Sequence, residues 1–150
     1  MADRYIARHP AGPVEMAWVE NALGLSGFAP AIAALLADMP RGVYRYAAGA
    51  EIITEGAEDR EVFLLYTGSA RVFRRDTAGA DRLIGELRPG DIFGEIAFLV
   101  DMPRSASVRA ETECAAVVFE TETFCQLTAQ HPALLAKLRK TASKRILELF

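Results

Sequence analysis

The stretch GDIFGEIAFLVDMPRSASVRA, residues 90–110, places a carboxylate and a guanidinium on either side of one short helical turn. Gly94 and Glu95 precede the apolar residues Ile96 to Leu99, and the sequence DMP breaks the chain before Arg104, nine positions after the glutamate. The alternating residues SVRA follow this break. The spacing therefore predicts a compact turn that carries two opposite charges.

The residue types in this turn favour a phosphate and a sugar as ligands. Gly94 allows a backbone to approach a ligand closely, and the first amides of the turn, at Glu95, Ile96 and Ala97, have no partner within it. Arg104 can direct two donors onto a phosphate. Glu95 can accept hydrogen bonds from ribose hydroxyls. Together these groups predict a site that binds a sugar phosphate.

The stretch resembles the phosphate-binding cassette of the cyclic nucleotide-binding domain family, which includes catabolite activator proteins, regulatory subunits of cyclic AMP-dependent kinase and cyclic nucleotide-gated channels. The matching pattern is F-G-E-(apolar)-A-(apolar)-(apolar), followed by P-R-(small)-A-(small)-V. The resemblance implies that Arg104, with Ser105 and Ala106 after it, binds the cyclic phosphate. It also implies that Glu95 and the Gly94 backbone hold the ribose 2′-hydroxyl. The alternative is that Glu95 and Arg104 pair with each other and bind nothing.

Composition indicates one globular domain rather than a disordered or membrane-spanning chain. The chain has 150 residues, 51% of them apolar, and a net charge of −3, which argues against nonspecific nucleic-acid binding. Cys114 and Cys125 lack metal-ligand spacing and are expected to be buried free thiols of a reducing compartment. The start of the chain has no apolar run typical of a signal peptide, and the longest apolar stretch is too short to cross a bilayer. We expect a cytoplasmic protein, with no membrane contact unless it belongs to a larger one.

From Val43 onward, short apolar runs separated by glycine turns predict an antiparallel fold. The predicted fold class is mainly β with flanking α: an antiparallel eight-stranded β-roll of the jelly-roll type, with N-terminal helices, a short cassette helix and two C-terminal helices. The predicted domains are residues 1–25, a loose leader with a short helix over 14–23, and residues 26–150, the nucleotide-binding domain. The helices expected in that domain, apart from the cassette turn, are 26–39, 121–129 and one from His131-Pro132 to the end.

The last helix carries an apolar stripe on an otherwise basic sequence. A stripe at this spacing packs on its own domain, covers a nucleotide base, or pairs with a second copy to form a homodimer. Its residues are Leu135, Leu138, Ala142 and Leu149.

The resemblance also places Val72 and Ile84 beneath the base, with Gly85 beside it. Arg145 could reach back from the last helix, although the favoured interpretation for it is a solvated charge. The base-side positions offer no polar side chain, so guanine's polar edge would lack partners. Serine follows the cassette arginine, as in catabolite activator proteins, whereas cyclic GMP-dependent kinases have threonine there. Cyclic AMP is therefore expected in preference to cyclic GMP.

Catalysis is not expected. A cupin-type metal enzyme needs clustered histidines, and the chain has only His9 and His131, both outside the predicted roll. No metal or cofactor is predicted, only a small cyclic nucleotide as partner. Because the sequence ends at Phe150, a DNA-binding helix-turn-helix of the catabolite activator type is not expected. The chain is a stand-alone module or the regulatory segment of a longer protein; the alternative is a degenerate fold used for dimerisation or as a scaffold.

Overall fold

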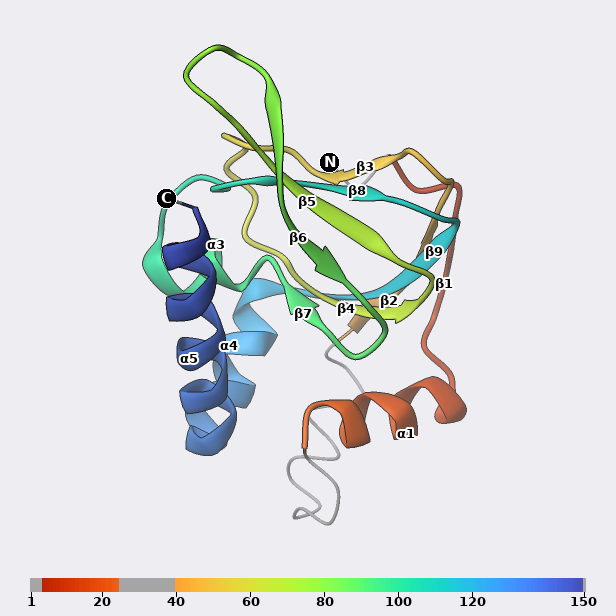
Figure 1. Ribbon diagram of the computed structural model, residues 1–150. Helices are drawn as coiled ribbons and strands as arrows, with labels where there is room; N and C mark the ends of the chain where they lie inside the picture. The colour runs from red at the N-terminus through yellow and green to blue at the C-terminus, as the bar shows by residue number, and fades with distance from the viewer. Residues whose placement is uncertain (1–3, 25–39, 150) are drawn as a thin grey trace.

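The computed structural model describes residues 4–24 and 40–149, which form nine strands and four helices (Figure 1). The strands are β1 (Ala7–His9), β2 (Pro40–Tyr46), β3 (Glu51–Ile53), β4 (Val62–Thr67), β5 (Ala70–Arg75), β6 (Asp81–Leu87), β7 (Ile92–Phe93), β8 (Ser107–Ala110) and β9 (Cys114–Phe119). The helices are α1 (Pro13–Ala22), α3 (Glu95–Val100), α4 (Thr121–Gln130) and α5 (Pro132–Glu148). The predicted helix over 26–39 lies outside the described residues.

The strands make two antiparallel sheets. One has the order β1-β2-β9-β4-β7 and the other β3-β8-β5-β6. The predicted mainly-β roll with flanking helices is confirmed. The additional ninth strand is β1, which pairs Ala7 with Arg45 and His9 with Val43 on the edge of β2. The prediction that this leader is loose is therefore wrong for residues 7–9, because their backbone pairs with an open sheet edge.

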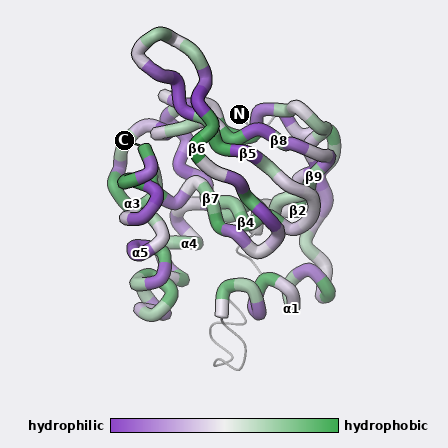
Figure 2. The backbone as a smooth tube through the Cα atoms, in the orientation of Figure 1, coloured by the Kyte–Doolittle hydropathy of each residue, from purple (hydrophilic) through white to green (hydrophobic). Residues whose placement is uncertain are grey.

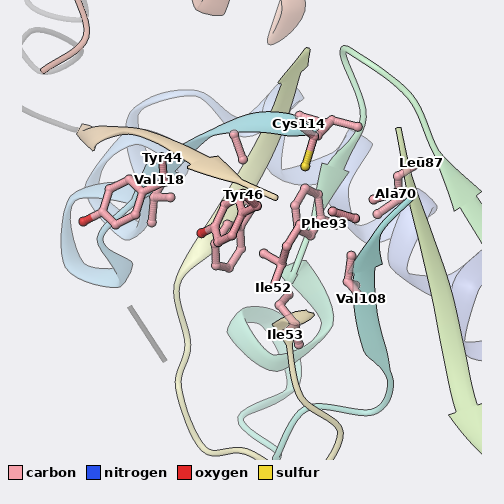
Figure 3. Packing of buried hydrophobic residues seen from close by; sticks show 14 residues of the cluster. Tyr44, Tyr46, Ile52, Ile53, Ala70, Leu87, Phe93, Val108, Cys114 and Val118 are labelled. Atoms are coloured by element: carbon pink, nitrogen blue, oxygen red, sulfur yellow. The ribbon is translucent and has the colours of Figure 1, made fainter. Parts of the chain in front are cut away.

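Strand β9 lies at the centre of the molecule and is buried on both faces. Alternate side chains of a strand point to opposite faces. Ala115, Val117 and Phe119 pack against α1, α4 and α5, while Cys114, Ala116 and Val118 face the second sheet. Figure 3 shows this second cluster, in which Tyr46, Ile52 and Phe93 meet between the sheets. The uninterrupted apolar sequence of β9 follows from this two-sided burial.

The helices cover one face of the five-stranded sheet. Val19 of α1 and Leu23, which follows that helix, enter the same core cluster as Phe124 of α4 and Leu138 of α5. In the apolar stripe of α5, Leu138, Ala142 and Leu149 are buried within the domain itself, whereas hydrophilic residues occupy other positions of the helix (Figure 2). No helix within 4–24 or 40–149 is long and apolar enough to cross a membrane.

The two cysteines differ in exposure. Cys114 is buried as predicted, and burial raises the pKa of its thiol to about 11. Cys125 is exposed, so the prediction that it is buried is wrong. It lies on the solvent side of α4, whose core-facing positions are occupied by Phe124, Leu127 and Thr128.

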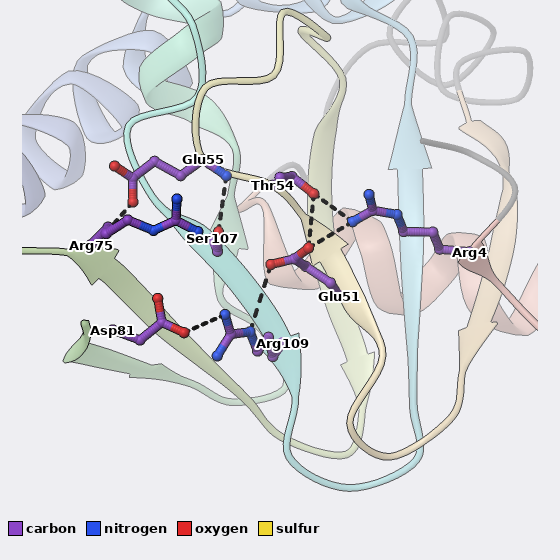
Figure 4. Close-up of polar contacts among 8 residues, drawn as sticks. All are labelled: Arg4, Glu51, Thr54, Glu55, Arg75, Asp81, Ser107 and Arg109. Carbon is purple, nitrogen blue, oxygen red and sulfur yellow. Dashed lines mark hydrogen bonds and ion pairs between the residues drawn. The ribbon is translucent and has the colours of Figure 1, made fainter. Parts of the chain in front are cut away.

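Polar contacts tie the edges of the four-stranded sheet together (Figure 4). The guanidinium of Arg109 on β8 pairs with Glu51 of β3 at 3.6 Å and with Asp81 of β6 at 2.6 Å. Arg4 donates to Glu51 and to Thr54, which holds the leader against β3. Because these groups are about one-third exposed, the pairs fix positions more than they stabilise the fold.

Candidate ligand-binding site

A pocket of about 670 Å³, counted to its open mouth, lies between the four-stranded sheet, α3 and the end of α5. All eleven residues predicted for the ligand site line it. Their contact with a ligand stays a prediction, but the structure brings them together from β5, β6, the cassette and α5. They are Val72, Ile84, Gly85, Gly94, Glu95, Ile96, Ala97, Arg104, Ser105, Ala106 and Arg145.

The guanidinium of Arg104 is fixed inside the protein, with only 2% of the side chain exposed. Its Nη1 donates to the Gly94 carbonyl at 2.9 Å. Its Nη2 donates to Asp59 Oδ2 at 2.6 Å and to the Glu61 carbonyl at 2.8 Å. The buried Nε has no hydrogen-bond partner among the described residues. Arg104 therefore lines the pocket with its position set and one buried donor unused.

Asp59 and Glu61 are the main site residues that the sequence analysis missed. Burial alone would raise the pKa of Asp59, but the hydrogen bond and the charge of Arg104 outweigh it and hold the pKa below its ordinary value. Asp59 therefore stays ionised and compensates the buried guanidinium. The sequence around it, GAEDRE, is like that of any acidic surface turn, and no local signal marks it as part of the site.

Gly94 is required by the position of Arg104. Its backbone is left-handed, with φ of 82°, and it precedes the first turn of α3. A Cβ at this position would lie 2.8 Å from Arg104 Nη1 and 2.8 Å from the Glu61 carbonyl oxygen. The group that comes close to this glycine in the structure is therefore the guanidinium of Arg104, whereas the sequence predicted a ligand there.

Glu95 pairs with the last helix. It is 1% exposed, and Arg145 Nη1 donates to its Oε1 at 2.7 Å and to the Ile92 carbonyl at 2.5 Å. The favoured interpretation of Arg145 as a solvated charge is therefore wrong, because α5 folds back over α3 and brings the guanidinium to a buried carboxylate. Glu95 and Arg104, the alternative pair, each have a different ionic partner.

The remaining wall of the pocket is mostly apolar. The pairing of β5 with β6 shifts register between Val72 and Phe73, opposite Gly85 and Leu83, so that Ile84 is the additional residue of the bulge and lines the pocket. The end of α5 adds Glu148 and Leu149, which the sequence analysis did not include. Glu148 is a carboxylate at a wall that we expected to be without polar side chains.

Two glycines with nearly the same positive φ test the packing around Arg104. At Gly79, with φ of 83°, an added Cβ would have no atom within 4 Å, whereas at Gly94 it would meet the arginine. Gly79→Ala should cost about 1–2 kcal/mol of unfolding free energy from backbone strain alone. Gly94→Ala should cost more and move Arg104, which would return the pKa of Asp59 toward its ordinary value. Denaturant unfolding and NMR titration measure both effects; equal losses in the two variants would contradict this packing.

Comparison with known proteins agrees with this geometry. A family model described as "Cyclic nucleotide-binding domain" matches residues 43–131. The cAMP-dependent protein kinase regulatory subunit of Neurospora crassa is 35% identical over 102 residues, which are 68% of this chain and 26% of that protein. The cAMP-activated global transcriptional regulator CRP of Salmonella typhimurium is 27% identical over 105 residues, 69% of this chain and 50% of the regulator. The chain thus spans between a quarter and a half of the length of these relatives.

Among solved structures, a cyclic nucleotide-binding domain from Methylobacillus flagellatus superimposes with a TM-score of 0.77 at 23% identity. The match covers 95% of this chain and 84% of that domain, which shows a shared fold. The family model covers more than half of the chain and includes the whole cassette. The chain belongs to the cyclic nucleotide-binding domain family.

Proposed function

We propose that the pocket binds a 3′,5′-cyclic nucleotide without chemically changing it, and that it takes cyclic AMP in preference to cyclic GMP. The observation that carries the proposal is the buried guanidinium of Arg104, which is held in place by Asp59 and two carbonyls and still has an unused donor. A cation fixed before the ligand arrives loses little side-chain entropy on binding an anion. A cyclic phosphate next to Arg104 would satisfy the Nε donor.

The neighbouring groups support the same ligand. No side chain caps the first turn of α3 among the described residues, so an anion beside Arg104 could also accept hydrogen bonds from the amides of that turn. Glu95 accepts from Arg145 through Oε1 only, and no described contact uses its second oxygen. A ribose 2′-hydroxyl could donate to that oxygen, so one ligand would engage both charged groups of the cassette.

The same contacts suggest how binding reaches the last helix. Glu95 belongs to α3 and Arg145 to α5, and they form a 2.7 Å ion pair beside the pocket. A ligand hydroxyl that donates to Glu95 competes with Arg145 for this carboxylate and can shift its position relative to Arg145. The ligand would therefore favour one arrangement of α5 over another, which is a population shift driven by different contacts in the two states. This mechanism needs no general base and breaks no covalent bond of the nucleotide.

The first prediction concerns the phosphate. Arg104→Ala should weaken cyclic AMP binding by about 2–5 kcal/mol, roughly 30- to several-thousand-fold, because the phosphate charge would be left buried and unpaired. Isothermal calorimetry measures this loss, with a change at an exposed arginine directly after β6, Arg88→Ala, as the control. Arg104→Lys keeps a cation and covers the case in which the alanine variant unfolds. Unchanged affinity in folded Arg104 variants would refute the site, and no binding by the wild type would favour the scaffold alternative.

The second prediction concerns the base. Most of the base-side wall is apolar, formed by Val72, Ile84 and Leu149 among others, and guanine's polar edge would be only partly satisfied there. Cyclic AMP should displace a fluorescent cyclic nucleotide at a lower concentration than cyclic GMP, and adenosine, which lacks the phosphate, should compete poorly. Displacement by cyclic GMP at the lower concentration would reverse the assignment. Ser105→Ala would then show whether the hydroxyl is the cause.

The third prediction concerns the coupling to α5. Amide hydrogen exchange across residues 134–149 should slow when cyclic AMP is added, because bound ligand favours the docked helix. In Arg145→Ala the change should be smaller at saturating nucleotide, since the connection between Glu95 and α5 is removed. Identical exchange with and without ligand in the wild type would show a domain that binds without switching.

A further inference from the structure

The last turn of α5 is held from two sides of the pocket. On one side Arg145 binds Glu95 and the Ile92 carbonyl. On the other side Arg82 of β6 donates from Nη2 to the carbonyl oxygen of Leu149 at 3.3 Å. Between these contacts, Glu148 and Leu149 form part of the pocket wall, and Leu149 is 8% exposed. Figure 1 shows the C-terminal end of α5 beside α3, at the level of the sheet that carries β6.

The direction of Arg82 follows from its place in the strand. Asp81 pairs with Arg109 and Leu83 is 48% exposed, so these two residues point to the outer face of the sheet. Because side chains alternate along a strand, Arg82 points to the opposite face, which is the pocket side, where Ile84 of the bulge also lies. The last carbonyls of a helix have no partner within it and carry a partial negative charge. The guanidinium of Arg82 reaches one of these carbonyls, that of the C-cap residue Leu149.

We propose, on the basis of the nucleotide-binding function above, that Arg82 acts as a latch, which here means that it holds the Leu149 carbonyl and keeps the last turn of α5 across the pocket before ligand arrives. Ligand exchange then requires this hydrogen bond to open. The two contacts that hold the turn are unequal. Glu95 is buried, whereas Arg82 is exposed to solvent. The Arg82 side is thus the weaker one, and the turn opens there first. Arg82 is a positioning residue, since it acts on the pocket through Leu149.

The latch is testable without any ligand. A single hydrogen bond of this kind shifts a local opening equilibrium by roughly 2- to 10-fold. In Arg82→Ala, the amides of residues 146–149 should exchange faster by that factor, while those of α4 stay unchanged. Arg88→Ala removes an exposed arginine whose side chain makes no hydrogen bond or ion pair among the described residues, and it should have no effect. Unchanged exchange at 146–149 in Arg82→Ala would overturn the latch.

The gating role is tested by kinetics. In stopped-flow experiments with a fluorescent cyclic AMP analogue, Arg82→Ala should raise both the association and the dissociation rate, again by roughly 2- to 10-fold. Arg82→Lys retains a charge and one donor and should lie between the alanine variant and the wild type. Faster amide exchange with unchanged ligand rates would overturn the gating role. If the wild type binds no cyclic nucleotide, the proposed function fails, and the ligand-free exchange experiment still decides whether the latch exists.

Discussion

The guanidinium of Arg104 cannot be left uncompensated at the depth where the fold places it, and much of the site follows from that constraint. An unpaired buried charge costs several kcal/mol. Asp59 supplies the opposite charge, the carbonyls of Glu61 and Gly94 accept two further Nη protons, and residue 94 has to be glycine to leave room. The protein thereby stabilises a fixed cation in a pocket wall in the absence of ligand.

The second charged group of the cassette is arranged differently. Glu95 is equally buried, but its partner is Arg145 of α5 rather than a residue of the roll. The same short helix α3 therefore follows a glycine fixed by the roll and carries a carboxylate paired with the last helix. This division explains how one ligand could be bound by a rigid part of the domain and sensed by a part that is able to move. Arg82 extends the same logic, because it connects the sheet to the final carbonyl of α5.

The parts of the site that could be predicted from the sequence are those with a local signal. Gly94, Glu95 and Arg104 lie within about ten positions of one another in the sequence, and their spacing predicts the cassette. The contacts it missed join distant residues: Asp59 is 45 positions from Arg104, and Arg82 is 67 from Leu149. Such partners depend on how the two sheets of the roll come together and on where α5 lies against them. The pattern of apolar residues in the sequence does not contain this information. Arg145 was misjudged for the same reason, since a basic helix gives no sign of which arginine bends toward a buried carboxylate.

The central claim is that Arg104 is a preformed anion site whose free Nε awaits a phosphate. A crystal structure of the chain with cyclic AMP tests it most directly. The account predicts a phosphate oxygen within hydrogen-bonding distance, about 2.7–2.9 Å, of Arg104 Nε, with Asp59 still bound to Nη2. A nucleotide bound with its phosphate elsewhere, or an Arg104 that leaves Asp59 to reach it, would contradict the account.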